Sequence, residues 1–121
     1  MAERYSSFDR RGWRWFLQRL TAAFLIIVLA FHFMLLHFVN HAENITFMGS
    51  TARMSQIGYL ITMVLFLITA TFHGVNGVHN ALVNQGLDGT QGKVVLGLLV
   101  IAGAALIVQG IRVALTMTGL A

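Results

Sequence analysis

Charged residues divide the chain into three long stretches that contain no Asp, Glu, Lys or Arg. These stretches cover residues 20–42, 54–87 and 94–111, which are 23, 34 and 18 residues long. A helix rises about 1.5 Å per residue, so about 20 apolar residues cross the roughly 30 Å hydrocarbon core of a bilayer. The pattern therefore predicts an all-α membrane protein with three transmembrane helices, at about 20–42, 57–83 and 92–118.

The composition supports a membrane protein and excludes several kinds of site. Of the 121 residues, 57% are hydrophobic and only 10% are charged, whereas about a quarter of the residues are charged in a soluble domain. The chain has no cysteine, which excludes disulfides, thiolate zinc sites and cysteine-ligated iron–sulfur clusters on it. Imidazole is left as the candidate metal ligand.

The basic residues are unevenly placed, which predicts the orientation of the chain. Residues 1–19 form a basic and aromatic arm that we expect at the membrane interface. It contains Arg4, Arg10, Arg11, Arg14 and Arg19, interleaved with Tyr5, Phe8, Trp13, Trp15 and Phe16. Lys93 makes six basic residues on this side, against Arg53 and Arg112 on the other. Because cytoplasmic loops carry the excess of Lys and Arg, we expect the N-terminus inside and the C-terminus outside. The net charge of +4 is interpreted as this orientation signal, and no nucleic-acid partner is expected.

Five histidines lie on the first two predicted helices: His32, His37, His41, His73 and His79. His41 and His79 fall near the interfaces, where ordinary hydrogen bonding explains them. His32 and His73 lie well inside apolar segments, where an ionisable ring is costly and is a functional hypothesis by default. Hydrogen bonding between helices is the competing explanation.

Other residues share the helix face of His73. At 100° per residue, Gly77, Asn80 and Asn84 lie within about 40° of that histidine. The face combines a ring nitrogen inside the membrane, a missing side chain one turn away and amides at the cytoplasmic boundary. A porphyrin along the helix needs these features: an axial ligand, room for the macrocycle and polar groups near the propionates.

The depths of the two inner histidines differ. His73 is expected about 8 Å inside the cytoplasmic boundary, and His32 about 18 Å from the same side. Two axial ligands of one iron lie at nearly equal depth, so these two are not expected to share a haem. If His73 binds iron, its partner ligand is expected on another chain.

Two segments and a histidine between them resemble a known family. Residues 13–21 (WRWFLQRLT), a histidine thirteen residues after Arg19 (His32), and residues 72–78 (FHGVNGV) are similar to the small membrane-anchor subunits of succinate dehydrogenase, respiratory complex II. The likeness is closest to cysteine-free anchors of bacteria and archaea. It implies packing against a second anchor subunit, and a complex with an iron–sulfur subunit and a flavoprotein in the inner (cytoplasmic) cell membrane. That complex passes electrons from succinate to a membrane quinone, and this chain is expected to be a non-catalytic anchor in it.

The resemblance implies haem ligands on this chain. The histidine that matches His73 is an axial ligand of haem b in the family, and Gly77 belongs to the same motif. In two-haem members a first-helix histidine ligates the second haem. Its best match is His32, with His37 as the second choice.

A quinone site is also implied, although this chain departs from the family pattern there. Arg19 and Trp15 are expected at the inner mouth, near the quinone or the haem propionates, and simple snorkelling of Arg19 is the alternative. Many anchors carry Asp-Tyr where this chain has Asn84 and Gln85, whose amides can still donate a hydrogen bond to a quinone. Relatives often have arginine where this chain has His79.

Two other functions remain as alternatives. A small transporter or proton-path component could use His32, His37 and Asn40 as a polar path, although no acidic residue lies within any predicted span. A cofactor-free membrane anchor would use its histidines only for hydrogen bonds between helices.

Overall fold

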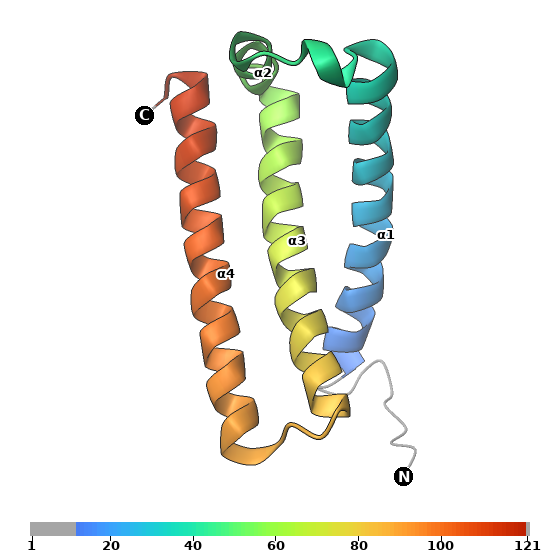
Figure 1. Ribbon diagram of the computed structural model, residues 1–121, viewed down its shortest axis with the longest axis vertical. Helices are drawn as coiled ribbons and strands as arrows, with labels where there is room; N and C mark the ends of the chain where they lie inside the picture. The colour runs from blue at the N-terminus through green and yellow to red at the C-terminus, as the bar shows by residue number, and fades with distance from the viewer. Residues whose placement is uncertain (1–11, 121) are drawn as a thin grey trace.

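The computed structural model describes residues 12–120, which form six helical segments (Figure 1). In chain order they are α1 (Gly12–Met34), the π-helical turn η1 (Leu35–Val39), the 3-10 turn η2 (Ala42–Asn44), α2 (Phe47–Met54), α3 (Ile57–Asn84) and α4 (Gly89–Thr118). Residues 12–120 contain no strand. The prediction of an all-α protein is therefore confirmed.

Three helical segments are long and apolar enough to cross a membrane, as the sequence predicts. They are Gly12–Val39, Ile57–Asn84 and Gly89–Thr118. The first begins eight residues before the expected start at 20, so the second half of the basic arm continues the helix. At about 1.5 Å per residue each segment is roughly 42 Å or longer, so its ends extend beyond the hydrocarbon core. The other arm residues, Arg4, Tyr5, Phe8, Arg10 and Arg11, lie outside the described residues.

The loop expected between the first two spans contains a short helix, α2. Thr46 is its N-cap, because its hydroxyl oxygen accepts a hydrogen bond from the backbone N–H of Gly49 at 3.0 Å. Near its end, Arg53 Nη2 donates to Ser50 Oγ at 3.1 Å. Figure 1 shows α2 lying across the end of the bundle, beside the start of α3.

Glycine ends α3, as the glycine-rich sequence after it indicates. Gly86 has φ of +103°, a left-handed conformation that other residues rarely adopt. The backbone N–H of Leu87 then reaches back to the carbonyl of Leu82 at 3.0 Å, which satisfies a carbonyl at the helix end. The chain reverses direction here and enters α4.

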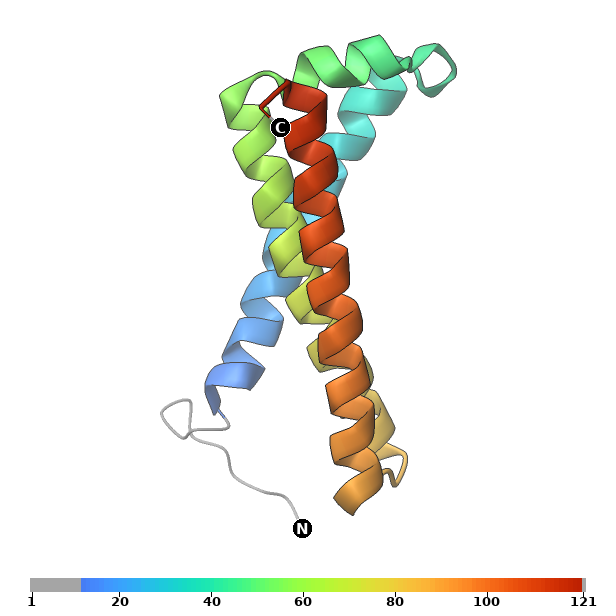
Figure 2. The same cartoon turned by 90° about the vertical axis from the view of Figure 1, so that its left-hand side faces the viewer.

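The helix α3 lies between α1 and α4 and packs against both (Figure 1). Figure 2 shows that the start of α1 and the start of α4 diverge. The start of α1 and the turn between α3 and α4 are at one end of the molecule, and α2 and the C-terminus are at the other. This separation of the two ends is what three crossings of a membrane would require.

Glycines allow α3 and α4 to pack closely. A Cβ atom at Gly103 would lie 2.9 Å from Thr71 Cγ2, and one at Gly110 would lie 2.5 Å from Leu67 Cδ2. Both glycines face α3 directly, because a methyl group at either position would overlap it. Small residues that let backbones approach are a typical basis of helix packing in membranes.

Very little of the chain is buried within residues 12–120. Apart from the glycines Gly12, Gly92 and Gly103, the buried residues there are Val28, Ala114 and the polar Asn76. Large apolar side chains such as Ile27 and Ile101 are more than two thirds exposed. An apolar surface of this extent is stable when lipid or other apolar helices cover it.

Candidate functional site

Four polar side chains meet between α1 and α3 and form what we call the polar seam: Gln18, Thr21, His73 and Asn76. Gln18 Nε2 donates to the backbone carbonyl of His73 at 3.2 Å, and Asn76 Nδ2 donates to Gln18 Oε1 at 2.8 Å. Thr21 Oγ1 lies 3.0 Å from Nδ1 of His73. The seam therefore connects the two helices by three hydrogen bonds.

Helix geometry explains why these residues meet. Gln18 and Thr21 are three residues apart on α1, and His73 and Asn76 are three residues apart on α3, so each pair lies on one helix face. Gly77 is next on the same face of α3. A Cβ atom there would lie 3.1 Å from Gln18 Nε2. The amide of Gln18 thus lies beside Gly77, where the sequence predicts room for a macrocycle.

His73 is half-buried. Among residues 12–120, its ring makes one hydrogen bond, between Nδ1 and Thr21 on α1. Thr21 Oγ1 also lies 2.7 Å from the carbonyl oxygen of Leu17 and 3.0 Å from that of Gln18. Nε2 of His73 makes no hydrogen bond with any residue between 12 and 120. That nitrogen is the ring atom left for another group.

Asn76 is the most buried residue of the seam, with 2% of its surface exposed. Its Nδ2 is bonded to Gln18, whereas its Oδ1 is buried and has no hydrogen-bond partner in the described part of the chain. An unpaired buried polar atom is costly, and more so where lipid replaces water. Asn76 therefore depends on Gln18 for the one hydrogen bond that its side chain makes there.

His32 lies elsewhere along the helices. It borders a small cleft between α1 and α3 with Val28, Leu29, Met63 and Phe66, and its Nδ1 is buried without a partner among residues 12–120. His73 contacts residue 21 of α1, which is eleven residues, or about 17 Å, from residue 32. The structure thus places the two histidines at different levels, as their positions in the sequence predict.

The remaining histidines have distinct surroundings. His37 is exposed, and its ring stacks on Phe33 with centroids 4.1 Å apart. His41 is also exposed and has φ of +49°, which is unusual for a residue with a side chain. His79 is half-buried, and its Nδ1 has no partner in the described part of the chain.

The residues expected near a quinone are not gathered at the seam. The guanidinium of Arg19 lies 3.7 Å from the centroid of the Trp15 ring, and both side chains are exposed. At 100° per residue, Arg19 is about 160° around α1 from Thr21. Asn84 and Gln85 are exposed at the end of α3. Figure 2 shows this end of α3 diverging from the start of α1.

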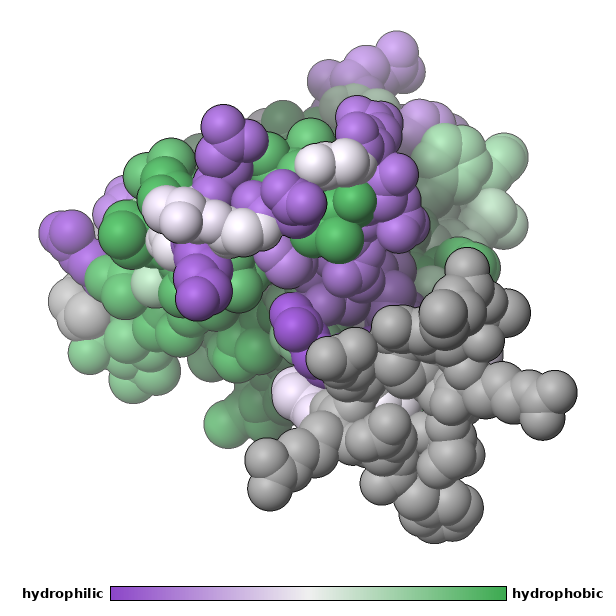
Figure 3. Space-filling view, turned by 90° about the horizontal axis from the view of Figure 1, so that it is seen from below, coloured by the Kyte–Doolittle hydropathy of each residue, from purple (hydrophilic) through white to green (hydrophobic). Residues whose placement is uncertain are grey.

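The end of the molecule that carries these residues is polar. Seen from that end in Figure 3, hydrophilic residues gather near the centre of the face, and hydrophobic residues lie beside them. This distribution is what an interfacial end of a membrane bundle requires.

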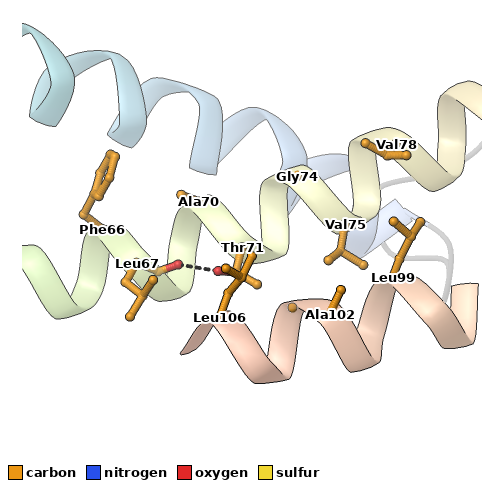
Figure 4. A pocket seen from close by; sticks show the side chains of 11 residues that line it. Phe66, Leu67, Ala70, Thr71, Gly74, Val75, Val78, Leu99, Ala102 and Leu106 are labelled. Carbon is orange, nitrogen blue, oxygen red and sulfur yellow. Dashed lines mark hydrogen bonds between the residues drawn. The ribbon is translucent and has the colours of Figure 1, made fainter. Parts of the chain in front are cut away.

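One of the grooves between α3 and α4 is apolar. Figure 4 shows its lining residues, among them Ala70, Gly74 and Leu99, and the hydrogen bond from Thr71 Oγ1 to the carbonyl of Leu67 at 2.8 Å. Because this hydroxyl is bonded to its own helix, the groove presents apolar surface. We place the chemistry of α3 on its other side, at the polar seam.

Histidines and carboxylates are dispersed over the structure. No three His, Cys, Asp or Glu side chains among residues 12–120 are grouped so that they would hold a metal ion. A scan of family models and searches of curated proteins and solved structures found no match to this chain.

Three residues of the seam are not among the site residues predicted from the sequence: Gln18, Thr21 and Asn76. Asn76 lies three residues after His73, and Gln18 and Thr21 have the same spacing, so each pair carries a detectable signal of a shared face. The sequence does not show which face of α1 meets which face of α3, and the structure does.

Proposed function

We propose that this chain is a haem b-binding membrane-anchor subunit of a succinate:quinone oxidoreductase, in which His73 is an axial ligand. The observation that carries the proposal is the state of the His73 ring, whose Nδ1 is hydrogen-bonded from α1 while Nε2 has no partner among residues 12–120. The resemblance of residues 13–21 and 72–78 to anchor subunits of succinate dehydrogenase supports the same function.

The donor set fits a haem with one ligand from this chain. A histidine that binds a metal through one ring nitrogen generally donates its other N–H to an oxygen, and Thr21 provides such an oxygen to His73. With one imidazole at this depth on this chain, the other anchor subunit would supply the other residue that holds the haem. When bound, haem b supplies one-electron redox chemistry.

The exposed residues at the polar end have supporting roles in the proposal. Arg19 would neutralise a propionate or contact the quinone, with Trp15 holding its guanidinium in place. Asn84 and Gln85 would donate hydrogen bonds from the end of α3. His32, whose Nδ1 is buried and unpaired in the described part of the chain, would ligate a second haem in a two-haem complex.

We further propose the assembly and its location. The basic end faces the cytoplasm of a bacterium or archaeon, and an iron–sulfur subunit docks there and carries electrons from a flavoprotein subunit. The exposed apolar faces of the three long helices are covered by a second anchor subunit and by lipid.

The test is a reduced-minus-oxidised optical spectrum of the complex, purified through a tag on this chain. We expect haem b bands in the wild type and their reduction or loss in His73→Ala, while His41→Ala keeps them because that side chain is exposed beyond the end of the first long helical segment. His32→Ala would halve the ratio of haem to flavin only in a two-haem complex.

Other outcomes would contradict the proposal. An unchanged spectrum in His73→Ala would remove the central assignment, and a colourless but fully assembled wild-type complex would indicate a cofactor-free anchor. Proton flux through liposomes that contain the full chain without haem would instead favour the polar-path function.

A further inference from the structure

We infer that Thr21 is the positioning residue of His73: its hydroxyl oxygen accepts the Nδ1–H of the imidazole and thereby fixes the tautomer whose Nε2 carries the lone pair. The ligand of that nitrogen is the haem iron of the proposed function, on which this part of the inference rests. The tautomer itself follows from the hydrogen bonds around Thr21.

The hydroxyl of Thr21 has more neighbours than it has hydrogens. A hydroxyl has one hydrogen to donate and two lone pairs. Thr21 Oγ1 is within hydrogen-bond distance of three groups: the carbonyl oxygens of Leu17 and Gln18, at 2.7 Å and 3.0 Å, and His73 Nδ1, at 3.0 Å. A carbonyl can only accept, so the short contact to Leu17 takes the hydroxyl hydrogen. The lone pairs of Oγ1 then face Nδ1 of His73.

The orientation of the hydroxyl determines the state of the imidazole. Since Oγ1 offers lone pairs, Nδ1 of His73 must carry the hydrogen of this contact. A neutral imidazole has one N–H, so its Nε2 is the acceptor and the atom able to bind a metal. Thr21 thus prepares His73 as an Nε2 ligand before any cofactor is bound.

The rest of the polar seam holds the backbone of the same residue. Gln18 Nε2 donates to the carbonyl of His73 at 3.2 Å, and Asn76 fixes Gln18 through Nδ2 at 2.8 Å. Both the ring and the main chain of His73 are therefore held from α1. Positioning of this kind is what a ligand held near its productive geometry requires.

A comparison with the other half-buried histidines supports the inference. His32 and His79 also have a buried Nδ1, but neither Nδ1 has a partner among residues 12–120. Thr62 shows that a helical threonine alone does not create the contact, because its hydroxyl donates to the carbonyl of Gly58 at 2.8 Å and orients no ring. Of these three histidines, His73 has the hydrogen-bonded support that metal-ligating imidazoles generally have.

The first test measures the tautomer and needs no haem. The full-length chain, labelled with ¹⁵N-histidine, is reconstituted in lipid bilayers, and its imidazole nitrogens are measured by solid-state NMR, with His73 assigned by His73→Gln. We expect Nδ1 protonated and Nε2 unprotonated in the wild type and in Thr62→Val. Thr21→Val is expected to change the His73 signals, and Thr21→Ser to restore them. A wild-type His73 protonated at Nε2, or signals unaffected by Thr21→Val, would overturn the inference.

The second test measures haem in the purified complex. Loss of a hydrogen-bonded support typically lowers metal affinity 10- to 100-fold, so we expect Thr21→Val to lose haem by about that factor and Thr21→Ser to keep it. If Thr21→Val weakens the binding of oxidised haem more than that of reduced haem, the midpoint potential of the haem rises. The rise is about 59 mV for each tenfold difference between the two losses of affinity.

The outcomes separate the positioning role from the proposed function. If His73→Ala keeps its haem, the function fails while the tautomer result stands. If His73→Ala loses its haem but Thr21→Val keeps both wild-type affinity and wild-type potential, the positioning role of Thr21 is refuted.

Discussion

Replacing Gln18 with leucine is the most direct perturbation of the polar seam. Gln18→Leu removes two hydrogen bonds between α1 and α3, one to the carbonyl of His73 and one from the amide of Asn76. Interhelical hydrogen bonds in membranes average about 0.6 kcal/mol each, so their loss alone costs roughly 1.2 kcal/mol. Asn76 is 2% exposed and would then have both polar atoms unpaired, which raises the expected loss of stability to as much as about 3 kcal/mol.

Gln109→Leu is a matched control for this substitution. Gln109 lies on α4, is exposed, and its side chain makes no hydrogen bond with any residue between 12 and 120. The same chemical change at that position replaces an exposed polar group of a helix that is long and apolar enough to cross a membrane, so we expect unchanged or increased stability. The difference between the two variants isolates the contribution of the seam.

Stability can be measured by titrating the full chain with SDS in mixed micelles and following tryptophan fluorescence, since both tryptophans are on α1. A double-mutant cycle with Asn76→Leu adds a second criterion. Because Gln18 and Asn76 are direct partners, the double variant should lose less stability than the sum of the single variants. Equal effects of Gln18→Leu and Gln109→Leu, together with an additive cycle, would refute the reasoning.

Two further predictions concern packing and orientation. Gly103→Ala places a methyl group 2.9 Å from Thr71 Cγ2, on a β-branched side chain with little freedom, and should cost about 1–3 kcal/mol in the same titration. Gly97→Ala, where nothing lies within 4 Å, should cost nothing, and equal costs would contradict the close packing. The chain has no cysteine, so Asn44→Cys and Thr90→Cys each introduce a single thiol. A membrane-impermeant maleimide added to intact cells should label only the former, and the reverse pattern would contradict a cytoplasmic N-terminus.

The three long helices could be predicted because lipid imposes a simple length and hydropathy requirement on a spanning segment. The start of α1 could not, since Arg14 and Arg19 mark where the chain leaves the apolar core but do not interrupt a helix. A charge limits the membrane span, whereas a helix continues until its backbone hydrogen bonds end. The short helix α2 lacks a long apolar run, and Thr46 as its N-cap is its clearest sign in the sequence.

The residues of the candidate site on α3 could be predicted from the sequence, whereas their contacts with α1 could not. Helical periodicity places His73 and Gly77 on one face of α3 from the sequence alone. It does not tell which face of α1 lies opposite, because polar side chains occur on more than one face of the first turns of α1: Arg19 is about 160° around the helix from Thr21. The sequence predicts a macrocycle beside Gly77, and in this chain alone the amide of Gln18 lies there.

The two sides of α3 associate with their neighbours by different physics, and this difference indicates where a cofactor belongs. Apolar contacts alone do not favour helix pairing in lipid, since lipid tails satisfy the same surfaces. The α3–α4 pair therefore depends on the close approach at Gly103 and Gly110, where any added group overlaps α3. The α1–α3 pair depends instead on the hydrogen bonds of Gln18 and Thr21. The hydrogen bonds between α1 and α3 hold these helices together and leave Nε2 of His73 available for another group. Within residues 12–120, the close packing of α3 against α4 leaves no polar group available in this way.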